Sequence, residues 1–92
     1  MSIEKGKFMN KIRKSIANNI VYYRIEKNWS QEYLAELLGT STTYLSEIEN
    51  EKRNISIDYL EHISDIFKIN AYELLIEREP LKRRVKRKSS KY

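Results

Sequence analysis

Apolar residues recur at helical spacing through most of the chain, and no segment alternates as a half-buried strand would. The first apolar stripe predicts a helix over residues 11–27, and its members are Ile12, Ile16, Ile20 and Tyr23. Further stripes predict helices over 31–38, 42–50 and from residue 57, the last with the stripe Ile57, Leu60, Ile63 and Phe67. A fifth, short helix is predicted over 71–77. The pattern therefore predicts an all-α fold of five helices.

Capping signals stand at the ends of these stripes. A serine precedes three of them, where its hydroxyl would accept from the first turn: Ser30, Ser41 and Ser56. Gly39 supplies the left-handed residue expected to end the second helix. Asn70 followed by Glu73 resembles a capping box, and Pro80 is expected to close the fifth helix. The very short link at Gly39 makes helices 31–38 and 42–50 an αα-corner. A helix-turn-helix is one form of such a corner, and geometry alone does not separate that form from the others.

Composition and charge narrow the function classes. The chain has 92 residues, which suits one domain, and contains no cysteine. No apolar run approaches the roughly 20 residues needed to cross a bilayer, and the first ten residues lack the apolar core of a secretion signal. We therefore expect a cytoplasmic protein without membrane partners. The net charge of +5 is uneven, because seven of the 18 Lys and Arg residues lie in residues 80–92, which hold no acid.

This distribution suggests three segments: an N-terminal arm at 1–10, a helical domain at 11–79 and a basic, flexible tail at 80–92. The tail is expected to be solvated, and it can also attract phosphates without regard to sequence. A catalytic role has little support, because the chain shows no Gly-rich phosphate loop and no nucleophile–histidine arrangement. His62 is the only histidine and has no neighbouring ligand cluster, so we expect no metal, cofactor or small-molecule ligand.

Residues 16–75 carry a family resemblance. The matching positions are Ile20, Arg24, Trp29–Gln31, Leu34–Ala35, Leu38–Gly39, Tyr44–Ser46, Ile48–Glu49, Lys52–Asn54, Leu60, Ile63 and Leu74–Leu75. This ordered pattern resembles the lambda-repressor-like DNA-binding domains, also called the Cro-repressor or xenobiotic-response-element type. The resemblance implies a compact five-helix domain that binds double-stranded DNA as a homodimer at a pseudo-palindromic operator, and we expect a repressor. Many relatives have Gly at position 51, where this chain has Glu51. We therefore expect either Asn50 to turn left-handed or the third helix to run slightly longer.

The resemblance also implies roles for individual residues. On the outward face of the third helix, bases would be contacted by Thr42, Thr43, Ser46 and Glu47. Phosphates would be contacted from the first turn of the second helix and from around the third helix by Gln31, Ser41, Tyr44, Lys52, Arg53 and Asn54. An ordinary solvated polar face is the alternative for most of these, and packing on the scaffold is an equal alternative for Tyr44. Trp29 is expected in the core.

Two further predictions concern assembly and structure. The resemblance implies that Arg24 forms a partly buried ion pair with Glu49 rather than a phosphate contact, and an arginine fork suits a carboxylate in this geometry. The fifth helix has more apolar residues than one inward stripe buries, so a dimer interface is predicted at Tyr72, Leu75 and Ile76. The alternative is that residues 1–10 fold back over this patch. Two other functions of a protein with this fold remain open. One is a controller of a restriction–modification operon, because the Arg53–Ile57 segment resembles that of some controllers, and the other is the antitoxin of a toxin–antitoxin pair.

Overall fold

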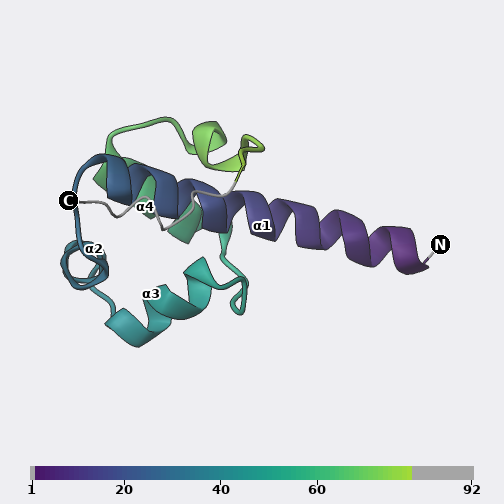
Figure 1. Cartoon of the computed structure of the whole chain (residues 1–92), viewed down its shortest axis with the longest axis horizontal. Helices are drawn as coiled ribbons and strands as arrows, with labels where there is room; N and C mark the ends of the chain where they lie inside the picture. Colours follow the sequence, from purple (N-terminus) through teal and green to yellow (C-terminus); the bar gives the residue numbers. More distant parts are fainter. Residues whose placement is uncertain (1, 80–92) are drawn as a thin grey trace, which may run out of the picture.

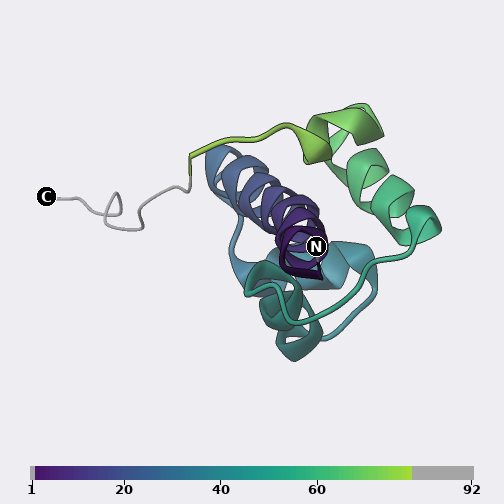
Figure 2. The same cartoon turned by 90° about the vertical axis from the view of Figure 1, so that its right-hand side faces the viewer.

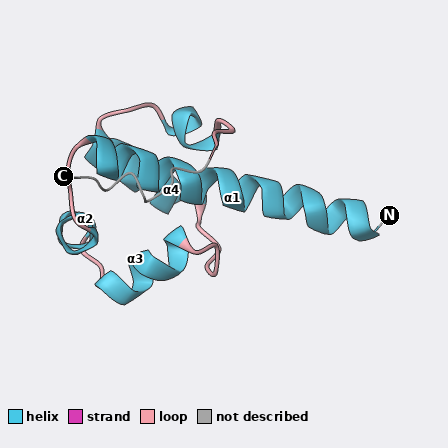
Figure 3. Ribbon diagram, in the orientation of Figure 1, coloured by secondary structure: helices cyan, strands magenta, loops and turns pink. Residues whose placement is uncertain are grey.

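The computed structural model describes the backbone of residues 2–79 and the side chains of residues 11–79. Four α-helices and one 3-10 helix follow one another: α1 (Ser2–Glu26), α2 (Gln31–Leu38), α3 (Thr42–Glu49), α4 (Ile57–Phe67) and η1 (Ala71–Leu75). Figure 3 shows helices and connecting loops only, with no strand in the part that is described. The all-α prediction is confirmed, with the fifth helix in 3-10 form. The prediction of a basic, flexible tail at 80–92 lies outside the described residues.

Helix α1 is longer than the sequence pattern predicted. It begins at Ser2 rather than near Lys11, so residues 2–10 continue the helix instead of forming a separate arm. Figure 1 shows this part of α1 projecting away from the other helices, and it does not fold back over η1. The physical reason is that nothing between Ser2 and Lys11 stops a helix. The segment has no proline, and its single Gly6 costs only about 1 kcal/mol relative to alanine.

The predicted caps form. The hydroxyls of Ser30, Ser41 and Ser56 each accept a hydrogen bond from the backbone N–H three residues further on, at 2.9–3.0 Å. Gly39 ends α2 with a left-handed φ of 76°. At the start of η1, the Glu73 carboxylate accepts from the Asn70 N–H at 3.2 Å, as the capping-box pattern predicted. These local signals set the boundaries of α2, α3 and α4 almost residue for residue.

The core is one cluster to which every element contributes. Its members are Ile16, Ile20, Tyr23, Leu34, Ala35, Leu38, Leu45, Ile48, Ile63, Phe67 and Leu74. Trp29 packs against this cluster, with its ring stacked on Phe67 at a centroid distance of 5.8 Å. The structural role predicted for Trp29 is therefore confirmed. Two members of the predicted stripes are exposed and one, Leu60, is only partly buried. The exposed residues are Ile12 (46%) and Ile57, in the first turn of α4 (82%).

Glu51 itself takes the left-handed conformation after α3, with φ of 65°, while Asn50 keeps φ of −102°. Neither of the two expected outcomes is correct, because α3 ends at Glu49 and the left-handed residue is Glu51. A left-handed non-glycine residue costs about 1–2 kcal/mol. The turn therefore forms against a local penalty, which the packing of the flanking helices offsets.

The fifth helix ends earlier than predicted, at Leu75 instead of Glu77, and Ile76 is extended. The cause is Asn19, a fully buried residue of α1. Its side-chain amide donates to the carbonyl oxygens of Leu74 (2.9 Å) and Ile76 (2.7 Å). Carbonyls at the C-terminal end of a helix have no partner within the helix, and Pro80 has no N–H that could bind the Ile76 carbonyl. A second element thus captures the end of η1 and turns the chain into an extended segment.

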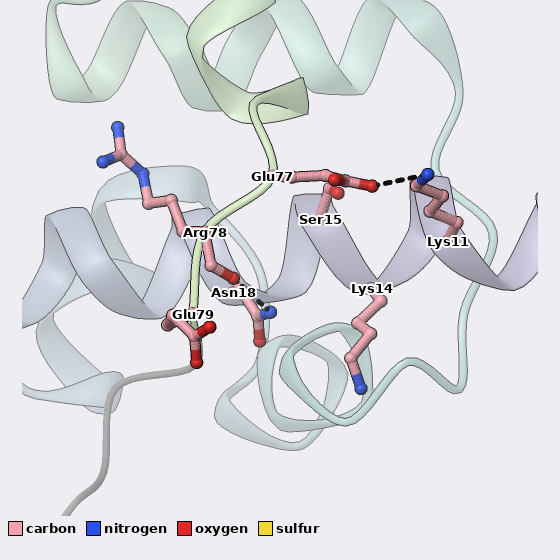
Figure 4. Close-up of a pocket in the computed structure, with 7 residues that line it drawn as sticks. All are labelled: Lys11, Lys14, Ser15, Asn18, Glu77, Arg78 and Glu79. Atoms are coloured by element: carbon pink, nitrogen blue, oxygen red, sulfur yellow. Dashed lines mark hydrogen bonds and ion pairs between the residues drawn. The ribbon is translucent and has the colours of Figure 1, made fainter.

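This extended segment, residues 76–79, is called the strap below. Figure 2 shows it running from η1 across one side of α1. The guanidinium of Arg78 lies over the ring of Tyr22 at 4.1 Å, and it donates to the Asn19 side chain and to the Tyr23 hydroxyl. Figure 4 shows the side chains along a polar pocket of about 350 Å³ beneath the strap, including an ion pair of 2.8 Å between Lys11 and Glu77. Residues 76–78 of the strap are therefore each held by α1.

Candidate nucleic-acid interface

Helices α2 and α3 form the predicted corner, on the side of α1 away from η1 in Figure 1. Leu45 and Ile48 of α3 point into the core. The residues predicted to contact bases lie on the other faces: Thr43 is exposed, and Thr42, Ser46 and Glu47 are partly exposed. Methyl, hydroxyl and carboxylate groups of this kind match the edges that base pairs present in the major groove. The outward face of α3 thus holds the required chemistry, and base contact by these residues stays a prediction.

A buried polar network fixes α3 to α1 and α2. Arg24 of α1 donates to both carboxylate oxygens of Glu49, at 2.9 and 3.1 Å, and to the Trp29 carbonyl at 3.1 Å. The predicted ion pair is therefore present, with 16% of the Arg24 side chain and 6% of the Glu49 side chain exposed. A bidentate arginine–carboxylate pair is among the strongest polar contacts in proteins. It ties the last residue of α3 to the first helix.

Gln31, predicted to contact a phosphate, also belongs to this network. Its amide nitrogen donates to Glu49 at 2.8 Å. One amide N–H is thus committed within the protein, and a phosphate would have to use the other. Ser41 is engaged in a similar way, because its hydroxyl caps α3 by accepting from Tyr44. The phosphate contacts of Gln31 and Ser41 remain predictions, but both side chains are held in place at the starts of α2 and α3.

Arg53 contacts both Tyr44 and Glu47 beside the outward face of α3. The Arg53 Nε donates to a Glu47 carboxylate oxygen at 2.7 Å, and its guanidinium lies 5.0 Å from the centre of the Tyr44 ring. Tyr44 packs edge-on against Tyr59 of α4 at 5.9 Å, as the scaffold-packing alternative expects, and a phosphate contact by Tyr44 stays a prediction. Burial raises the pKa of the Tyr59 hydroxyl. The sequence predicted Glu47 and Arg53 as separate contacts and did not predict that they pair.

The connection from α3 to α4 supplies the other predicted phosphate contacts, Lys52 and Asn54, both of which are exposed. The Asn54 side chain accepts a hydrogen bond of 2.6 Å from Arg13 of α1. Arg13 was not predicted from the sequence, because it lies among other basic residues on what resembles an ordinary solvated helix face. Its contact with a residue 41 positions away has no local sequence signal. Arg13 adds a positive charge beside this connection.

The residues predicted to form the dimer interface lie near the C-terminal end of the described domain, and their side chains are exposed. Tyr72 is 64% exposed, Leu75 45% and Ile76 42%, while Leu74 between them is fully buried. Among the side chains of residues 11–79, no group of three or more acidic, histidine or cysteine residues is placed to hold a metal ion. None of the described helices is long and apolar enough to cross a membrane. Because they are apolar and exposed, Tyr72, Leu75 and Ile76 on η1 and the strap form a candidate surface for contact with another protein.

Comparison with known proteins places the fold in a family. A model of the helix-turn-helix family matches residues 20–74. The control protein C.MunI from a Mycoplasma species is 42% identical over 74 residues, which is 77% of this chain and 100% of that protein. The transcriptional regulator SinR from Bacillus subtilis is 41% identical over 64 residues, 68% of this chain and 58% of that protein. The chain spans about three fifths of the length of SinR and of a hypothetical transcription factor from Neisseria meningitidis.

Solved structures agree. The crystal structure of the Neisseria factor has a TM-score of 0.68 at 35% identity, and covers 71% of this chain and 75% of that one. A structure of SinR in complex with DNA has a TM-score of 0.61 at 39% identity, and covers 66% of this chain and 98% of that one. The family model alone matches more than half of the chain, and it spans the corner and the buried network. The chain therefore belongs to the helix-turn-helix family, in its lambda-repressor-like form.

Proposed function

We propose that this protein is a sequence-specific DNA-binding transcriptional regulator that acts as a homodimer at a pseudo-palindromic operator. The observation that carries the proposal is the outward face of α3, whose groups suit base edges, on a helix held at both ends by the Ser41 cap and by the network of Arg24 and Glu49. SinR, whose solved structure contains DNA, shares this fold at 39% identity. The expected action is repression, in the cytoplasm and without catalysis.

In the proposed complex, α3 enters the major groove and its early residues contact base edges. The threonine methyls would meet thymine methyl groups, and Glu47 would accept from a cytosine amino group. Phosphates on either side would be contacted by Gln31 at the start of α2 and by residues around α3: Ser41, Tyr44, Lys52 and Asn54. Phosphate contacts set the position and the affinity, whereas base contacts set the sequence preference.

Charge supports a division of labour between domain and tail. Because all 13 acidic residues precede residue 80, residues 1–79 carry a slight excess of negative charge, and the tail carries the positive surplus. The domain would therefore depend on specific contacts rather than on bulk attraction. The tail would add attraction that is independent of sequence and is weakened by salt.

Binding-site selection tests the proposed contacts to bases. Wild-type protein should recover one motif from a random DNA library. Thr43→Val and Glu47→Gln should each change that motif while folding is preserved, since both side chains lie on the outward face. A lost base contact costs about 1–3 kcal/mol of discrimination. If wild type recovers no motif, the proposed function is wrong; if both variants recover the wild-type motif, the assignment of these residues is wrong.

Two-fold symmetry is the second part of the proposal. Family members place two corners about 34 Å apart, one turn of DNA. We propose that the exposed patch of Tyr72, Leu75 and Ile76 joins the two copies. Sedimentation of Ile76→Glu should show a monomer where wild type is a dimer. Ile57→Glu is the matched control, because Ile57 is also an exposed isoleucine but lies in the first turn of α4. A dimer that survives Ile76→Glu must be joined through another surface.

A more specific candidate is a controller of a restriction–modification operon. The supporting observation is that C.MunI, a control protein, is covered over its whole length at 42% identity. A controller of this kind would bind DNA upstream of restriction–modification genes. Footprinting on the DNA that flanks the gene for this protein is the test. Protection of a site in front of such genes supports this candidate, and flanking genes of another kind leave only the general regulator.

A further inference from the structure

Arg53 stands in an unusual position for a phosphate contact. Its Nε donates to Glu47 at 2.7 Å, and its guanidinium lies over the ring of Tyr44, with the central carbon 5.0 Å from the ring centre. Tyr44 in turn packs against Tyr59 of α4. The guanidinium is thus held from two sides, by a carboxylate on α3 and by an aromatic ring that is anchored to the scaffold. Lys52, its neighbour in sequence, has no ion pair among the described residues.

Glu47 needs a partner if it is to approach DNA. A carboxylate on the outward face of α3 would meet the negative potential of two phosphate backbones and be repelled. Pairing with Arg53 makes the two side chains neutral as a unit. The pair uses only one carboxylate oxygen of Glu47, so the second oxygen has no hydrogen-bond partner among residues 11–79. That oxygen is therefore available as an acceptor.

The pairing also weakens the case for Arg53 as an independent phosphate clamp. The positive charge of Arg53 is offset by a carboxylate in contact with it, so its net attraction for a phosphate is reduced. A lysine at position 53 would keep the charge. It would lose both the planar group that stacks on Tyr44 and the Nε donor that fixes Glu47. The choice of arginine at this position therefore matters for geometry more than for charge.

We propose that Arg53 is a positioning residue for sequence specificity, which neutralises Glu47 and holds it so that its second carboxylate oxygen accepts from a cytosine amino group. This inference rests on the proposed function and adds to it. It assigns one base-pair preference of the operator to three side chains acting together, Tyr44, Glu47 and Arg53. Discrimination at that base pair depends on the pair of charged groups, and neither provides it alone.

The test measures dissociation constants of the full chain on the operator found by site selection and on operators changed at single base pairs. Arg53→Gln and Glu47→Gln should lose discrimination at the same base pair, by about 5- to 150-fold. The double variant should lose no more discrimination than Glu47→Gln alone, because the two groups act as a unit. Arg53→Lys should lose discrimination as well, although it keeps the charge.

Lys52→Gln is the matched control for a phosphate contact. It should weaken binding to all sequences by a similar factor and lower the salt slope by about 1. Circular dichroism confirms folding of each variant, which is expected because the Arg53 and Glu47 side chains are 50% and 38% exposed. If Arg53→Gln behaves like Lys52→Gln and Arg53→Lys is indistinguishable from wild type, Arg53 is a phosphate clamp and the inference is overturned. If wild type selects no motif, the proposed function fails first, and this inference fails with it.

Discussion

The network of Arg24, Glu49 and Gln31 makes a quantitative prediction about stability. Arg24→Met removes two hydrogen bonds to Glu49 and one to the Trp29 carbonyl, and it leaves a carboxylate that is 6% exposed with only Gln31 as a partner. Breaking one side of a buried pair costs about 3–5 kcal/mol. The Arg24 side chain is partly accessible to water, so the lower end, about 3 kcal/mol, is expected.

This loss is large relative to the whole. A domain of this size has a free energy of unfolding of roughly 4–12 kcal/mol, at about 0.05–0.15 kcal/mol per residue. A loss of about 3 kcal/mol should therefore lower the Tm by roughly 15 °C and leave the protein folded at low temperature. Glu49→Met should cost a similar amount, because it leaves the charged Arg24 side chain, of which only 16% is exposed, without its carboxylate partner. The double variant replaces both charges by apolar groups of similar volume, and should cost at least 2 kcal/mol less than the sum of the single variants.

Urea unfolding followed by circular dichroism measures these differences. All proteins are compared at one concentration, because dissociation of a dimer makes the apparent stability depend on concentration. Arg13→Met is the control. It removes an exposed arginine contact on the same helix and should change stability by no more than about 0.5 kcal/mol. Single variants that each cost less than 1 kcal/mol, or a double variant equal to their sum, would refute the assignment of a coupled, buried network.

Four further outcomes are expected. Glu51→Gly should raise the free energy of unfolding by about 1 kcal/mol, because glycine accepts φ of 65° without strain, whereas Glu51→Ala should not; urea unfolding separates the two. Asn19→Leu should lower the free energy of unfolding by about 3 kcal/mol, because two carbonyls at the end of η1 and the Arg78 side chain lose their partner. Burial first, and then a hydrogen bond to a carboxylate, raise the pKa of Tyr23 above its ordinary 10.0. Its contribution is therefore complete below pH 10 and is lost as pH rises further, so the decline in stability between pH 9 and pH 11 should be shallower in Tyr23→Phe. Deletion of residues 81–92 should weaken binding to all DNA by a similar factor and flatten its salt dependence, while the recovered motif stays the same.

Local signals account for most of what could be predicted. Ser30, Ser41 and Ser56 each cap a helix through a contact only three residues away, and the left-handed φ of Gly39 depends on that residue alone. Such features depend on a few adjacent residues and can be predicted from them. The extent of α1 was underestimated for the opposite reason: no signal marks its start, and a helix without a stop continues.

Contacts between distant residues account for what was missed. The end of η1 is set by Asn19, which lies more than 50 residues earlier, so the sequence around Ile76 still resembles a helix. The guanidinium of Arg78 lies over the ring of Tyr22, and no local sequence pattern predicts a contact between residues so far apart in the chain. The strap lies beyond the segment matched by the family model, which ends at residue 74, so resemblance could not supply it either.

Two separate polar clusters flank α3, and they predict different kinds of mutant. The cluster of Arg24, Glu49 and Gln31 is buried and joins three helices, so damage to it moves α3 as a body and should weaken binding to every sequence. The cluster of Tyr44, Glu47 and Arg53 lies on the surface and joins α3 to the connection that follows it. Damage there leaves the helix in place and disturbs one carboxylate. A variant that loses affinity without losing its motif therefore points to the first cluster or to a phosphate contact, and a variant that keeps its stability but changes its motif points to the second.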